Sequence, residues 1–189
     1  MRQRSSWALF FLACMVSALP AAAKPVDHFT AFAVDMSNTA GHTRAGSVDV
    51  IINRWSTPEE RDRLVGALRE GGTDTLLRAL QKIKKPAGYI RSAGSIGYPL
   101  RFAWQEPTSD GGRRVIIATD RPVSFLEAST QPRTMEYPFM LIDLRVDAQG
   151  KGQGKLLPLA KITAHPDHVV EIENYSSEPV RLTEVRELK

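Results

Sequence analysis

Cysteine is almost absent from this chain of 189 residues, and the one that occurs, Cys14, lies near the N-terminus. We expect Cys14 to be removed with a signal peptide, which leaves a mature chain without a thiol. Such a chain has neither a disulfide framework nor a catalytic thiolate. The alternative is lipid attachment at Cys14, although the preceding Phe11-Leu12-Ala13 begins with a poor residue for that signal.

The apolar run near the N-terminus is too short for a membrane span. It extends over 13 residues, from Trp7 to Leu19, whereas a helix needs about 20 residues to cross a bilayer. Two arginines precede the run and three alanines follow it, which is the pattern of a secretory signal. We therefore expect a signal peptide from Met1 to Ala23 and a periplasmic or secreted mature chain without a transmembrane span.

A strong excess of one charge is also lacking. The chain has 25 basic and 21 acidic residues, and loss of the leader removes two of the basic ones, which leaves 23 against 21. A net charge of about +2 with scattered basic residues does not indicate nucleic-acid binding. The 166 residues left after removal of 23 suit one domain, residues 24–189, with a core that needs no cross-links.

Three stretches approach known site motifs without their structural context. Ala93–Gly97 departs by one residue from a nucleophile elbow and is followed by a strand pattern instead of a helix. Gly150–Lys155 is one residue short of a phosphate-binding loop and lacks its Ser or Thr. His165–His168 offers two imidazoles and a carboxylate but no further ligand set. We predict no catalytic residue, no metal site and no cofactor from these stretches.

Alternating apolar and polar residues predict a mostly β chain of the α+β class. We expect an antiparallel sheet curled into a sandwich or a partly open barrel. Turns are expected at Asp110–Gly112 and at Gly150–Gly154, where glycines supply positive φ angles. The expected strands are Asp27–Asp35, Val48–Trp55, Tyr89–Ser92, Leu100–Gln105, Arg113–Thr119, Met140–Asp147, Leu156–Thr163, Val169–Asn174 and Val180–Arg186.

A helical hairpin is expected at about residues 57–84, inserted between strands. Thr57, Pro58 and Glu60 form a capping box with proline at the first helical position. Gly71-Gly72 ends the first helix, and a second helix runs from Thr73 to the lysines before Pro86. This hairpin is either a lid or a structural plug.

Aromatic and arginine side chains give the best candidate for a ligand site. Arg54 and Trp55 end the second expected strand, and Arg91 and Trp104 lie on later ones. Guanidinium groups bind carboxylates and phosphates, and indole rings stack on flat or sugar-like groups. The alternative is that the tryptophans are core residues and the arginines are solvated or paired with acids.

Three segments resemble parts of a group of uncharacterised exported bacterial proteins. They are Val50-Ile51-Ile52-Asn53-Arg54-Trp55-Ser56-Thr57, Val115-Ile116-Ile117-Ala118-Thr119-Asp120-Arg121-Pro122 and Tyr137-Pro138-Phe139. The resemblance implies a bacterial source, export and a single domain. It carries no activity and no binding residues.

These observations favour a non-enzymatic exported protein that binds a small molecule or a cell-envelope partner. A small envelope hydrolase, with its acid and base on separate strands, is the first alternative. A structural or interaction module, recognised by an exposed apolar patch or an uncovered edge strand, is the second.

Overall fold

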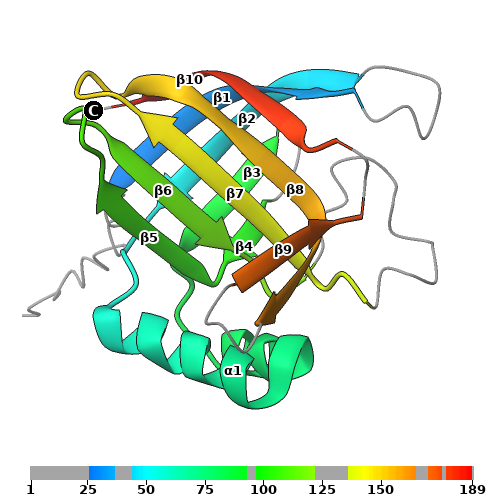
Figure 1. The fold of residues 1–189 in the computed structure, drawn as a ribbon. Helices are drawn as coiled ribbons and strands as arrows, with labels where there is room; N and C mark the ends of the chain where they lie inside the picture. The colour runs from blue at the N-terminus through cyan, green and yellow to red at the C-terminus, as the bar shows by residue number, and fades with distance from the viewer. Residues whose placement is uncertain are drawn as a thin grey trace, which may run out of the picture.

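The computed structural model describes residues 26–36, 44–92, 97–121, 136–164, 170–175 and 178–188. The expected signal peptide, the His165–His168 stretch and most of Ala93–Gly97 lie outside these residues. Within these ranges, one helix, α1 (Pro58–Gln81), accompanies ten strands (Figure 1). The strands are β1 (Asp27–Asp35), β2 (Arg44–Ile52), β3 (Gly88–Ser92), β4 (Tyr98–Leu100), β5 (Phe102–Pro107), β6 (Arg113–Ala118), β7 (Phe139–Val146), β8 (Lys151–Ala164), β9 (Val170–Asn174) and β10 (Val180–Glu187).

The strands form one antiparallel sheet that curls nearly into a closed barrel, as the sequence predicted (Figure 1). The order is β4-β3-β2-β1-β10-β8-β7-β6-β5, and β9 pairs with the far end of β8. The first and last strands of the domain, β1 and β10, lie side by side. This pairing joins the two halves of the sheet, so the curled shape depends on contacts between distant parts of the chain.

A seam separates the two edge strands, β4 and β5, which the chain connects through Arg101 alone. Ser56, in the segment after β2, is buried against the β5 edge. Its N–H donates to the Ala103 carbonyl at 2.8 Å, and its hydroxyl accepts from the Ala103 N–H at 3.2 Å. Ser56 therefore satisfies part of the β5 edge in the way that a neighbouring strand would.

The inward-facing side chains fill the inside of the barrel. Alternate residues of the long strands point inward, as the period of two requires. The largest fully buried side chains of this core include Phe29, Ile52, Ile117, Ile142 and Leu182. The enclosed space is therefore a packed core.

The start of α1 has the expected capping box. Thr57 is the N-cap, its hydroxyl accepts from the Glu60 N–H at 3.2 Å, and Glu60 accepts from the Thr57 N–H at 3.2 Å. The two expected helices form one helical element that is interrupted where the sequence predicted their boundary, at Gly71 and Gly72. Gly72 has a φ of 65°, which favours glycine.

Several expected boundaries were wrong. Strand β2, expected at Val48–Trp55, runs from Arg44 to Ile52. The turn between β7 and β8 lies at Asp147–Gly150, and the glycines after it belong to β8. A β-carbon at Gly152 or Gly154 would collide with the backbone of β7, so these glycines allow a close approach of two strands. The expected strand Leu100–Gln105 is broken at Arg101, where the chain passes from β4 to β5.

Arg113 closes one end of the barrel core by bonding to several strands. Its guanidinium lies 3.0 Å from carboxylate oxygens of Asp27 on β1 and of Glu187 on β10. It also donates to Gln105 at 2.6 Å and lies over the Phe29 ring at 5.3 Å. Burial opposes its charge, but the bonds and charges of Asp27 and Glu187 raise the pKa of Arg113, which keeps it ionised.

We expect Arg113→Gln to lower the free energy of unfolding by about 2 kcal/mol, because it leaves the largely buried Asp27 carboxylate without its ion-pair partner. Chemical denaturation monitored by circular dichroism measures this value. Arg186→Gln removes the same charge from an exposed position on β10 and serves as the control. Equal stability of the two variants would contradict a central role for Arg113.

Candidate functional site

Helix α1 lies below the barrel in Figure 1, where its leucines pack against residues at one end of β5 to β8, and it is attached at both ends and at its break. Near the start, Arg54 donates to Glu60 at 2.7 Å. At the break, the Thr73 hydroxyl donates to the Ile162 carbonyl of β8 at 2.8 Å. After the end, Arg101 donates to the Ile83 carbonyl at 3.0 Å. These contacts fix the position of the helix relative to the sheet.

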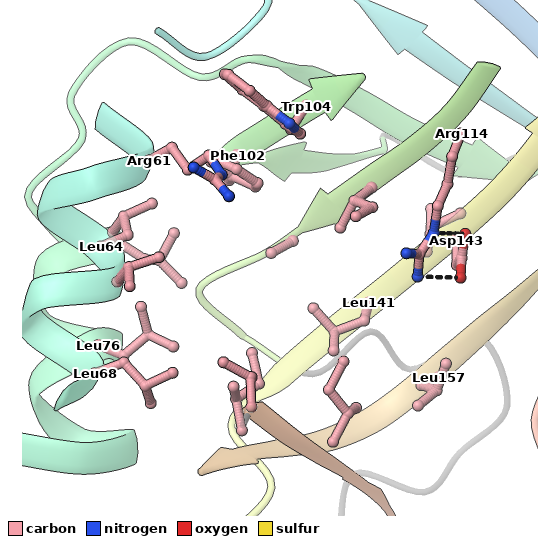
Figure 2. A pocket seen from close by; sticks show the side chains of 18 of the residues that line it. Arg61, Leu64, Leu68, Leu76, Phe102, Trp104, Arg114, Leu141, Asp143 and Leu157 are labelled. Carbon is pink, nitrogen blue, oxygen red and sulfur yellow. Dashed lines mark hydrogen bonds and ion pairs between the residues drawn. The ribbon is translucent and has the colours of Figure 1, made fainter. Parts of the chain in front are cut away.

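A groove of about 500 Å³ lies between α1 and the sheet (Figure 2). Leucines of the helix form one wall, and outward-facing residues of β5 to β8 form the floor. No Ser, Thr, Cys, His or Tyr lies among those of the described residues that line it. The lining is Arg61, Leu64, Val65, Leu68, Leu76, Leu80, Phe102, Trp104, Glu106, Arg114, Ile116, Ala118, Leu141, Ile142, Asp143, Lys155, Leu157, Ile162, Val170, Ile172 and Pro179.

The register of the strands arranges the outer face in three transverse rows. The row that packs against the helix, which we call the apolar row, has no polar side chain. Ala118 in this row has the smallest side chain, which leaves space beneath the helical leucines. The apolar row consists of Phe102, Ala118, Leu141 and Leu157.

Polarity rises with distance from the helix. The next row, the mixed row, consists of Trp104, Ile116, Asp143 and Lys155. The third row, the polar row, consists of Glu106, Arg114, Arg145 and Gln153. Successive rows are two residues apart along each strand, or roughly 7 Å. The outer face of these four strands thus changes from wholly apolar to wholly polar over about 13 Å.

Several of the polar side chains that line the groove contact one another. Arg114 donates to both oxygens of Asp143, at 3.0 and 2.8 Å, as Figure 2 shows. These hydrogen bonds raise the pKa of Arg114. Trp104 donates from its indole nitrogen to Glu106 at 3.1 Å, and the Arg61 guanidinium lies 5.4 Å from the Trp104 ring centre. Both carboxylates of the groove are therefore already engaged.

The rim formed by β9 is apolar and exposed. Val170 is 47% exposed and Ile172 is 52% exposed, although both line the groove. Large apolar side chains that stay half exposed next to an apolar hollow extend the surface on which an apolar ligand can be buried.

Of the four residues that the sequence proposed as a ligand site, Trp104 lines the groove and the other three do not. Arg54 is bonded to Glu60 and, at 2.9 Å, to the Lys85 carbonyl. The Trp55 ring packs against the barrel core, and its nitrogen donates to Asp27 at 3.1 Å. Arg91 is half exposed on β3 and pairs with Asp49 at 3.2 Å.

Sequence reasoning missed the leucines of α1 and the outward residues of β7 and β8. A signal was present, because Leu141, Asp143 and Arg145 occupy alternate positions and pass from apolar to charged. A strand whose second face begins apolar must be covered at that end. The sequence could not show that the same change from apolar to charged side chains occurs at matching positions of the neighbouring strands.

Among the described residues, no three His, Cys, Asp or Glu side chains come together in a way that could hold a metal ion. No helix in the described ranges is long and apolar enough to cross a membrane. No family model, curated protein or solved structure matches the chain.

The attachment of α1 at Arg54 predicts a pH dependence. Burial of Glu60 opposes its charge, but hydrogen bonds from Arg54 and the Thr57 N–H, with the charges of Arg54 and Arg63, lower its pKa. A lowered pKa stabilises the fold above the usual glutamate value of about 4.3, and this stabilisation is lost as the pH falls through the folded-state value.

We expect Glu60→Gln to lower stability at pH 7 and to flatten the loss of stability on acidification. Thermal unfolding between pH 7 and pH 3 measures both effects. Glu70→Gln, an exposed change on the same helix, is the control. If Glu60→Gln loses as much stability on acidification as the unaltered protein does, the Arg54–Glu60 contact does not stabilise α1.

Proposed function

We propose that this protein is an exported binding protein that holds a small apolar molecule, without covalent chemistry, in the groove between α1 and β5 to β8. The observation that carries the proposal is the apolar row, which α1 covers without filling the space above it. A volume of about 500 Å³ lies within the range of roughly 300 to 1,000 Å³ that is usual for small-molecule sites.

The energetic reason is burial of apolar surface. Leu64, Leu68 and Leu76 from the helix face Leu141 and Leu157 from the sheet across the groove (Figure 2). An apolar ligand between them removes surface from water on both walls, at about 25 cal/mol for each Å². Because the barrel core is packed, this outer groove is the better site.

Hydrolysis is the weaker alternative for this site. The part of the lining that the structure describes has no hydroxyl, thiol or imidazole that could serve as a nucleophile or a base. Asp143 is held by two hydrogen bonds from Arg114, and Glu106 accepts from Trp104. Two carboxylates engaged in this way favour a binding role over acid and base catalysis.

Export is supported by the expected signal peptide at Met1–Ala23 and by the resemblance to exported bacterial proteins. The proposed location is the periplasm or the outside of the cell, and the proposed partner is a small molecule. A cell-envelope protein bound at the exposed apolar rim of β9 is the second candidate, because Val170 and Ile172 are half exposed there.

We expect the protein to bind N-phenyl-1-naphthylamine, a neutral apolar dye that fluoresces in apolar surroundings. Leu157→Gln places an amide on the groove floor and should weaken binding about tenfold, because burial of an unpaired amide costs roughly 1 to 3 kcal/mol. Fluorescence titration measures the dissociation constant, and circular dichroism checks the fold.

The matched control is Phe32→Gln, which makes a similar change at an exposed residue of β1 outside the groove. It should bind the dye as the unaltered protein does. Absence of dye binding to the unaltered protein, or equal weakening by both variants, would contradict the proposed site.

A further inference from the structure

The charge balance of the groove is positive. Three cations, Arg61, Arg114 and Lys155, line it with two carboxylates, Glu106 and Asp143. Each carboxylate already accepts a hydrogen bond from a groove residue. Within the described part of the chain, the Lys155 ammonium has no ion-pair partner. A positive charge beside an apolar floor is suited to a ligand that carries both an apolar part and an anion.

Two pairs of like charges face each other across neighbouring strands, and one member of each pair lines the groove. Arg114 on β6 lies opposite Arg145 on β7, and Lys155 on β8 lies opposite Arg181 on β10. Like charges directly opposite in a sheet are destabilising. Asp143 offsets part of this repulsion through Arg114, and Glu178, 4.0 Å from Arg181, offsets part of it in the second pair. An added anion near Lys155 would offset more of it.

The apolar and charged regions lie in line along the strands. A molecule about 13 Å long that follows the strand direction can place one end on the apolar row and the other at the polar row. Lys155 sits between them, in the mixed row, directly opposite Asp143. The floor therefore determines the orientation of a bound ligand as well as its position.

From this geometry we infer that the occupant is a small single-chain amphiphile with an anionic head, its alkyl chain under α1 and its head at Lys155 and Arg114. The inference rests on the proposed function, since it specifies the ligand of the same groove. The alkyl chain contacts Leu68, Leu141 and Leu157, and the head meets the cationic end of the floor.

The test compares two probes with the same chain and opposite heads, dodecanoate and dodecyltrimethylammonium, at pH 7 and below their micellar concentrations. Isothermal titration calorimetry gives both dissociation constants. We expect the unaltered protein to prefer dodecanoate. Lys155→Glu should weaken dodecanoate about fivefold or more and should tighten dodecyltrimethylammonium, because the rim charge changes sign.

The matched control is Lys151→Glu, the same change on the same strand four residues away, outside the groove lining. It should leave the preference for dodecanoate in place. Reversal of preference in Lys155→Glu also shows that the groove remains formed, because a misfolded variant would lose both probes.

Failure of this inference is distinct from failure of the proposed function. Equal affinity for the two probes, with no effect of Lys155→Glu, overturns the anionic head while dye binding still supports the groove. Loss of dye binding as well overturns the groove itself. Binding to phosphatidylglycerol vesicles without binding to dodecanoate also overturns the inference and indicates a membrane surface as the partner.

Discussion

The inward-facing side chains of the strands pack against one another and fill the space that the sheet encloses. This packing constrains everything else, because a barrel with a solid core has to offer a ligand its outer face. Arg113 closes one end of the core through bonds to Asp27 and Glu187, and Ser56 satisfies part of the β5 edge at the seam. The barrel is thus a rigid support, and the groove is formed on its surface by an added helix.

Helix α1 forms that groove because it is held at separate points while its apolar side meets a floor with a small residue at its centre. The Arg54–Glu60 pair holds the start of the helix, and Thr73 holds its break to β8. The small side chain of Ala118, in the apolar row, leaves a space open between the helix and the sheet. The same helix therefore covers apolar strand positions and also forms a wall of the proposed site. The two roles considered for this segment, a lid and a structural plug, do not exclude each other.

Local patterns were sufficient to predict much of the fold. Alternation predicted β1 from Asp27 to Asp35, and the capping box predicted the start of α1. Pairing of β1 with β10 has no local signal, because it joins the two ends of the domain. Gly152 was expected in a turn, but it lies in a strand because the backbone of β7 approaches it closely. The site was harder to predict than the fold. Trp104 was identified from its residue type, but the groove floor depends on the register of four strands, which a single sequence does not specify.

The central claim is that an apolar chain lies between α1 and β5 to β8. The most direct test is NMR spectroscopy of protein with labelled leucine and valine methyl groups, saturated with dodecanoate, to record nuclear Overhauser effects from the alkyl chain. The account predicts contacts to the methyl groups of Leu68, Leu141 and Leu157 on the two walls. Contacts to core residues such as Val50 and Leu182 instead would place the ligand inside the barrel and contradict it.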